Sequence, residues 1–182
     1  MPAGRIHDRI TLWGLPVIVT ATLSRTGSTE ITLAVATGFL LGGLLLGPDL
    51  DTRSIHYKRW GWLRWIWWPY RHYIRHRSPL SHGPLLGTTV RVCYLLGWLL
   101  MLGCVGVALA NELLQLGWTW NQMGDRLHAL ITHHWLAWVA LAIGLELGAI
   151  SHILADWSLS TYKRIRKYGW KGKKQQKRKH KR

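Results

Sequence analysis

The sequence predicts an all-α fold: a membrane-embedded four-helix bundle, with a Trp-rich segment at the membrane surface between its second and third helices. Three observations predict it. The apolar residues gather in four long runs, and the stretches between them hold most of the charge. The chain has 13 Trp against one Phe, and indole rings favour the membrane–water boundary. The formal net charge of +16 is concentrated in two of the segments outside the runs.

The four apolar runs are expected to form the helices, and they differ in length. At about 1.5 Å per residue, residues 85–110 and 134–155 exceed a hydrocarbon core of about 30 Å. Residues 31–47 barely reach across it, and residues 10–23 fall short. Because Pro16 interrupts helical hydrogen bonding, the first helix is expected to kink, to span with its flanks, or to form a re-entrant hairpin with the second.

A cleaved signal peptide is the alternative interpretation of the N-terminus. Arg5 and Arg9 precede a short apolar run, and residues 19–21 weakly resemble a cleavage site. Pro16 breaks that run, however, and a second short apolar run follows at once. These two features favour a first helix that is retained as half of a hairpin.

The charge of the remaining segments predicts an integral, multi-pass membrane protein with both termini in the cytoplasm. Residues 48–84 hold seven Lys or Arg, and residues 163–182 hold twelve with no acidic residue. Residues 24–30 and 111–133 each hold one basic residue. Because basic segments stay in the cytoplasm, four crossings place the middle segment and both termini there.

The chain is expected to divide into a four-helix metal-binding domain, residues 1–162, and a disordered basic tail, residues 163–182. The tail is expected to contact anionic lipid headgroups, with nucleic acid as the less favoured partner because no recognition fold accompanies the charge.

The Trp-rich segment, residues 60–70, is too short and too charged to cross a bilayer. We expect it to lie in the interface, where its aromatic side chains reach headgroup depth and Arg64 and Arg71 meet lipid phosphates. The alternative is a Trp-rich core segment packed between helices.

Four short motifs carry His and Asp, and all of them fall at the cytoplasmic helix ends of this topology. They are His7 and Asp8 before the first helix, Asp49 and Asp51 in GPDLD after the second, His76 and His82 in HRSPLSH before the third, and His152 and Asp156 in SHILAD at the end of the fourth. The topology was deduced without using these positions, so the agreement predicts one common site.

The spacing within the motifs suits metal coordination. His152 and Asp156 are four residues apart on one helix face, and Asp49 and Asp51 flank a single residue where the chain leaves a helix. Mixed imidazole and carboxylate ligands favour zinc, manganese, iron or nickel over magnesium or calcium. The predicted ligands exceed the needs of one tetrahedral ion, so we expect either two ions or some residues that only support ligands; the set is His7, Asp49, Asp51, His76, His82, His152 and Asp156.

Other polar residues are interpreted by their position. Those that adjoin the motifs are expected to support ligands or bind substrate: Asp8, Arg77, Ser81 and Ser151. Arg77 suits a substrate phosphate, an Asp ligand or a lipid headgroup. Glu146 lies about 9 Å from His152 along the fourth helix, which suits a supporting role or a protonated side chain packed against another helix. Surface roles are expected for His56, His72, His128, His133 and His134.

The motifs GRIHDRIT, GPDLD, HRSPLSHG and SHILAD, together with WGWLRWIWWPY, resemble those of a family of cyanobacterial membrane proteins described only as metal-binding. The resemblance covers residues 1 to about 165 in motif order and spacing and omits the basic tail. More distantly, the pattern is similar to that of the SOS-regulated inner-membrane metal-dependent hydrolases. The resemblance implies a shared metal site, and the more distant family implies hydrolysis.

The sequence thus predicts a membrane protein with one or two divalent transition metals, zinc ahead of manganese and iron, that hydrolyses a phosphoester at the cytoplasmic face. Clustered His and Asp bind such ions, and the surrounding arginines favour an anionic substrate. The non-enzymatic alternative is a metal that staples the helix ends, for which the ligand set would be closed to water. An ion transporter ranks third, because only Glu146 suggests a polar path.

Overall fold

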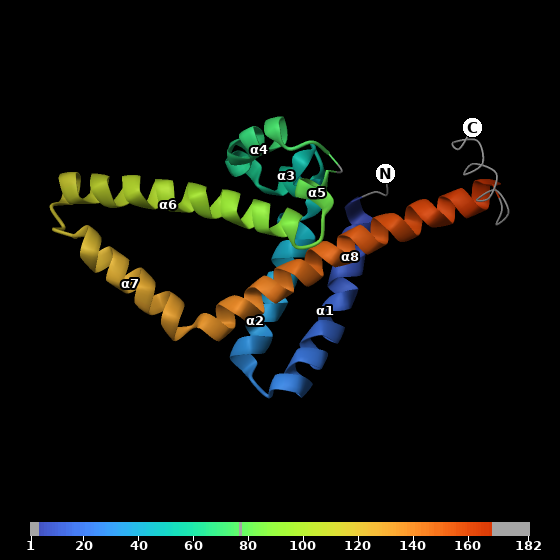
Figure 1. Ribbon diagram of the computed structural model, residues 1–182, viewed down its shortest axis with the longest axis horizontal. Coiled ribbons are helices and arrows are strands. Elements are labelled where there is room, and N and C mark those ends of the chain that lie inside the picture. The colour runs from blue at the N-terminus through green and yellow to red at the C-terminus, as the bar shows by residue number, and fades with distance from the viewer. Residues whose placement is uncertain (1–3, 77, 169–182) are drawn as a thin grey trace.

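The computed structural model describes residues 4–76 and 78–168, and all regular structure in this part of the chain is helical (Figure 1). The all-α prediction is therefore confirmed. In chain order the elements are α1 (Gly4–Thr26), α2 (Thr29–Leu40), the π-helix η1 (Leu41–Leu45), the 3-10 helix η2 (Pro48–Asp51), α3 (Ile55–Arg59), the 3-10 helix η3 (Gly61–Ile66), α4 (Trp67–Tyr73), α5 (Pro79–His82), α6 (Leu86–Leu114), α7 (Trp120–His133) and α8 (Trp135–Tyr168).

Helices α1 and α2 form a hairpin with a tight turn (Figure 1). α1 ends where Gly27 adopts a left-handed conformation, φ +62°, and its N–H donates to the Leu23 carbonyl (2.8 Å). A side chain at this φ would be strained, so glycine suits the position. Ser28 then caps α2, because its hydroxyl accepts a hydrogen bond from the Ile31 N–H (3.3 Å).

The α2–η1 segment and α8 pack with their backbones in close approach. Each contributes two glycines spaced four residues apart, Gly38 and Gly42 on one side and Gly144 and Gly148 on the other. A Cβ at Gly42 would lie 2.2 Å from the Leu145 carbonyl oxygen, and at the other three positions a backbone atom would lie within 2.4 Å. Small residues in this spacing are typical of closely packed membrane helices. The contact holds the end of α2 against the middle of α8.

The C-terminal end of α2 continues into a π-helical turn, in which the Leu46 N–H donates to the Leu41 carbonyl (2.7 Å). Pro48 cannot donate to this ladder, and it begins η2 instead. Asp49 and Asp51 therefore sit on a tight 3-10 turn directly at the helix end.

The elements from η2 to α5 fold over this end of the helices as a cap (Figure 1). Trp67 and Tyr70 are buried in its core, whereas Trp62 and Trp68 are 80% and 64% exposed. One side of the Trp-rich segment therefore packs inside the cap, as the core interpretation expects, and the other presents indole rings on the surface; its place in a membrane interface stays a prediction. The core of the cap and the helix beneath it comprises Leu46, Leu50, Ile66, Trp67, Tyr70 and Leu145.

The four long helices do not pack as one bundle. α1, α2 and α8 lie together, but α6 is buried only at its start, where Gly87, Thr88 and Arg91 are covered. Beyond these residues α6 diverges from α8, and α7 runs between their separated ends like the third side of a triangle (Figure 1). The expectation of a four-helix bundle is therefore not supported. The sequence could not show this, because a uniformly apolar helix packs equally well against lipid and against another helix.

Three helical segments are long and apolar enough to cross a membrane: Thr29–Asp51, Leu86–Leu114 and Trp135–Lys167. α1 spans 23 residues and runs through Pro16, but it is not among the three segments that meet this criterion. The first apolar run thus forms a longer helix than expected, although not one of comparable hydropathy.

Two helices extend beyond the predicted elements. α7 occupies a stretch that was expected only to connect helices, and Thr119 and Gln122 form a capping box at its start. α8 continues through Lys163 as far as Tyr168, so the first part of the basic tail is helical. The rest of the tail lies outside the described residues.

Candidate metal centre

The four His/Asp motifs meet where the cap covers the start of α1, the end of α2 and the middle of α8. Six of the seven predicted ligands form two groups of three, and in each group one ligand atom from every residue lies within 4.8 Å of the others. The first group comprises His7, His152 and Asp156, and the second comprises Asp49, His76 and His82. Asp51, the seventh, contacts the second group.

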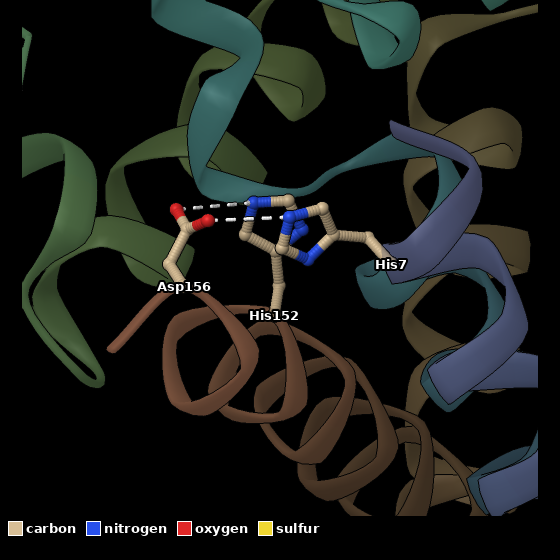
Figure 2. A group of neighbouring side chains, drawn as sticks. All are labelled: His7, His152 and Asp156. Atoms are coloured by element: carbon tan, nitrogen blue, oxygen red, sulfur yellow. Dashed lines mark ion pairs between the residues drawn. The ribbon is translucent and has the colours of Figure 1, made fainter. Parts of the chain in front are cut away.

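In the first group, two imidazoles face one carboxylate (Figure 2). His7 Nε2 lies 3.2 Å from Asp156 Oδ1, and His152 Nε2 lies 3.9 Å from Asp156 Oδ2. The two rings are buried and stacked, with centroids 4.0 Å apart. His152 Nε2 has no hydrogen-bond partner among the described residues. Two neutral imidazoles and a carboxylate in this arrangement can converge on one divalent cation.

In the second group, Asp51 orients a histidine. His76 Nδ1 lies 3.0 and 3.1 Å from the two Asp51 carboxylate oxygens. An ionised carboxylate can only accept, so Nδ1 carries the proton and the buried Nε2 is left with a lone pair for an ion. The predicted ligand Asp51 is therefore placed behind His76, as a group that supports a ligand.

Ser81 orients His82 in the same way. Its hydroxyl donates to the Ser78 carbonyl (3.5 Å) and so can accept from His82 Nδ1, 2.7 Å away. His82 Nε2 then faces Asp49 Oδ1 at 3.4 Å. The supporting role expected for Ser81 agrees with this geometry.

Asp49 joins the two groups. Its Oδ1 lies 3.4 Å from His82 Nε2, and its Oδ2 lies 3.4 Å from His152 Nε2. A carboxylate whose two oxygens face different ligand groups can bridge two ions, which in two-metal sites lie about 3.5–4 Å apart. The donor set therefore fits either one divalent transition metal or two with Asp49 between them.

The remaining predicted site residues lie elsewhere or outside the described chain. Asp8 pairs with Arg59 (2.6 Å), which ties α1 to the cap. The Ser151 hydroxyl donates to the Gly148 carbonyl of its own helix (2.8 Å). Arg77 lies outside the described residues.

Glu146 has a partner inside the helical region. It accepts a hydrogen bond from the Leu85 N–H (2.9 Å) at the start of α6. Its carboxylate therefore satisfies a backbone donor that the first turn of a helix leaves free. The contact gives a partner to Oε1 alone, and Oε2 is buried without a hydrogen-bond partner among the described residues.

Arg91 is a buried residue that the sequence analysis missed. Its Nη1 donates to the Ser81 carbonyl (2.6 Å) and its Nη2 to the Thr88 hydroxyl (3.1 Å). It thereby holds the residue that precedes the ligand His82. The signal was available, because a charged residue inside an apolar run usually has a buried partner.

The surface role predicted for His56 is wrong, because this residue is only 1% exposed. Its ring packs edge-on against His152 with centroids 5.0 Å apart, and a Cβ on Gly47 would lie 2.0 Å from it. Burial, and then the neighbouring His152, lower the pKa of His56 to about 3, so its imidazole is neutral. The sequence does not distinguish it from His72, because its burial arises from the folding of the cap.

Comparison with known proteins agrees with this donor chemistry. Residues 2–166 match a family described as uncharacterized metal-binding protein (DUF2227). An uncharacterized protein of Aquifex aeolicus (strain VF5) is 44% identical over 59 residues, which cover 32% of this chain and 41% of that protein's length. No solved structure matches the chain significantly. The chain therefore belongs to the DUF2227 family of uncharacterized metal-binding proteins.

Proposed function

We propose that the protein is a membrane-embedded hydrolase that uses one or two divalent metal ions to cleave a phosphoester at the cytoplasmic face. His152 Nε2 carries this proposal: it is buried without a hydrogen-bond partner among the described residues, 3.4 Å from Asp49 Oδ2 and 3.9 Å from Asp156 Oδ2. Such a nitrogen is costly to bury unless an ion or a proton joins it to the carboxylates. Membership of a metal-binding family favours the ion.

Some of the predicted site residues would bind an ion, and others would orient the residues that bind it. His7, His152 and Asp156 would hold one ion, and His76 and His82 would hold a second that shares Asp49 with the first. Mixed imidazole and carboxylate donors favour zinc, with manganese and iron next. Such an ion polarises a phosphoryl oxygen and lowers the pKa of a coordinated water when bound.

A cavity that reaches these ligands favours a catalytic metal over a purely structural one. A cavity of about 280 Å³ is bordered by His7, Asp49 and His152. Catalytic metal sites keep an open position, whereas structural sites are closed by protein ligands. The cavity gives a substrate access to the same side chains that would hold an ion.

The membrane setting rests on the three long apolar segments and on the exposed apolar surface of α6. We propose that α1 crosses with α2 as a hairpin, so that the chain crosses four times. The basic cap and the basic tail then place the metal centre and both termini in the cytoplasm. Anionic lipid headgroups would bind the tail.

A structural metal is the second candidate, because the ligands come from both the first and the last helix. An ion shared by His7 of α1 and by His152 and Asp156 of α8 would fasten these helices together whether or not it is catalytic. Turnover distinguishes the two functions, since both require metal retention.

Elemental analysis of detergent-purified protein tests the metal centre. Asp49→Ala and His152→Ala should lose most of the metal, because each removes a donor that the other ligands cannot replace. The control His133→Ala changes an exposed residue at the end of α7 and should leave the metal content unchanged. Equal metal content in all four proteins would contradict the centre.

The hydrolase itself is tested by phosphate release from p-nitrophenyl phosphate. We expect turnover that a chelator abolishes and that zinc, manganese or iron restores. A fully metal-loaded protein that hydrolyses no phosphoester, including phosphorylated lipids and glycerol phosphate, would favour the structural alternative.

A further inference from the structure

The cavity beside the metal centre has a second wall that the metal does not explain. One wall consists of His7, Asp49 and His152, which belong to the candidate ligand set or contact it. Residues 52–56, which join η2 to α3, line the same cavity. Whatever occupies the cavity therefore meets the metal centre and this segment at once.

Two polar side chains of the segment are already committed to local hydrogen bonds. The Thr52 hydroxyl donates to the Asp49 carbonyl (3.0 Å), and the Ser54 hydroxyl accepts from the Tyr57 N–H (3.4 Å) to cap α3. Arg53 and His56 remain, and neither forms a hydrogen bond or an ion pair with the described residues. Together with the Ser54 O–H, which the acceptor role of this hydroxyl leaves free, these two side chains are the donors that residues 52–56 offer to a ligand.

His56 is held rigidly in this role. Its ring is almost completely buried between Gly47 and His152, and both of its nitrogens lack a hydrogen-bond partner among the described residues. A buried donor without a partner is costly, and native structures normally satisfy it with protein, water or ligand. Because the His56 ring borders the cavity, a ligand oxygen bound there could accept a hydrogen bond from one of its nitrogens.

Arg53 indicates the charge and shape of that ligand. It is exposed to solvent at the cavity and has no acidic partner among the described residues. A guanidinium group presents a planar fork of donors that matches the oxygens of a phosphate. The volume of about 280 Å³ lies just below that of pockets for drug-sized ligands, so it suits a phosphate with a small substituent, and the acyl chains of a lipid monoester would remain outside it.

We propose that this cavity binds the terminal phosphate of a phosphate monoester, with Arg53 and His56 as protein donors and the metal centre on its other side. The inference rests on the proposed hydrolase and names its substrate class. The same phosphate group occurs in soluble monoesters and in the lipid phosphatidate, and both present the oxygens that this site would recognise.

Calorimetric titration of the metal-loaded full chain with inorganic phosphate tests the assignment of Arg53. Arg53→Gln should weaken phosphate binding about tenfold or more, because it removes a charge-assisted contact. Arg64→Gln removes the same charge from an exposed position of the cap that does not line the cavity, and it should bind phosphate like the unaltered protein. Equal affinity in Arg53→Gln and in the unaltered protein would overturn the proposal.

A pair of variants tests His56 against a role as metal ligand. His56→Ala removes the donor and should weaken phosphate binding while the metal content stays unchanged. His56→Gln restores an N–H donor and should recover part of the affinity, and it keeps the test decisive if the alanine variant fails to fold. Metal loss in His56→Gln would make His56 a ligand and overturn its assignment to phosphate.

Competition identifies the source of the phosphate. Displacement of inorganic phosphate by nanodiscs containing phosphatidate, but not by phosphatidylcholine nanodiscs, would support a lipid monoester, and displacement by glycerol phosphate would support a soluble one. Failure of both compounds to compete would overturn the site. A protein that binds phosphate through Arg53 but hydrolyses nothing retains this site and loses only the proposed hydrolase.

Discussion

Asp49 and Asp51 show how two identical side chains acquire different roles within one short turn. The 3-10 geometry of η2 turns the Asp51 carboxylate into the cap, where it is inaccessible to solvent and meets His76. Asp49 is instead left between His82 and His152, with one oxygen directed to each. A carboxylate that accepts a hydrogen bond from a ligand histidine fixes the tautomer of that histidine. A carboxylate that lies between several histidines can itself coordinate the ion.

The difference between the two aspartates predicts different effects on metal binding. Asp51→Asn keeps the shape of the side chain and removes the charge that orients His76, so metal affinity should fall about 10- to 100-fold without disappearing. Competition with a chromophoric chelator measures this change. A complete loss of metal in Asp51→Asn, equal to that expected for Asp49→Ala, would show that Asp51 is a ligand after all.

Most of the candidate site could be predicted from single residues, because ligand chemistry is a local property of the motifs. His152 and Asp156 share a helix face whatever the rest of the chain does. His56 and Arg91 could not be assigned in this way, since their burial and contacts are created by the cap and by the start of α6. The supporting role of Ser151 stays a prediction, since its hydroxyl donates to its own helix and keeps its acceptor lone pairs.

At the scale of elements, the glycines between α2 and α8 determine where the ligands meet. The backbones of these helices approach so closely that no Cβ fits at Gly144, where one would lie 2.2 Å from the Val35 carbonyl oxygen. Because this contact lies two turns before His152, it positions the ligand helix relative to η2. The glycines in the middle of α6 have no such role, since a Cβ at Gly97, Gly103 or Gly106 meets nothing within 4 Å.

Alanine substitutions at Gly144 and at Gly103 should therefore have opposite effects. Gly144→Ala forces α2 and α8 apart and should lower the free energy of unfolding by about 1–3 kcal/mol, with loss of metal. Gly103→Ala should be neutral or stabilising by up to about 1 kcal/mol, because alanine is the better helix former. Denaturation in detergent and metal analysis measure both effects. Similar results for the two variants would contradict the close helix contact.

The elements themselves were largely predictable, since long apolar runs become helices in almost any setting. Their ends were less so: α8 continues to Tyr168 because basic residues form helix readily once a helix has begun. α7 was missed although Met123, Leu127 and Leu130 follow a helical period. A search for continuous apolar runs misses a helix of this kind, because only one of its faces is apolar.

At the scale of the whole molecule, the distribution of charge and the place of the metal centre point to the same face. The cap that covers the ligands also holds most of the basic residues outside the tail. The divergence of α6 could not be predicted, because apolar side chains do not encode whether lipid or protein covers them.

Reporter fusions test the orientation of the whole chain. A reporter at Gly27, in the turn between α1 and α2, and a reporter after Arg182 should localise to opposite sides of the membrane, because we propose that the basic segments hold both termini in the cytoplasm. Localisation of both reporters to one side would contradict four crossings and would show that α1 and α2 enter without spanning.

The contact between His7 and Asp156 has a consequence for biogenesis. These side chains lie 3.2 Å apart, yet almost the whole described chain separates them in sequence. In the proposed orientation α1 would enter the membrane first, and its histidine would meet the Asp156 carboxylate only after α8 has been made. An ion bound by the first group would therefore be acquired last, and it would close a loop that contains all the other helices, which constrains the chain as a late crosslink would. A chain truncated before α8 would lack His152 and Asp156 and would not retain this ion, so metal retention would separate complete chains from truncated ones.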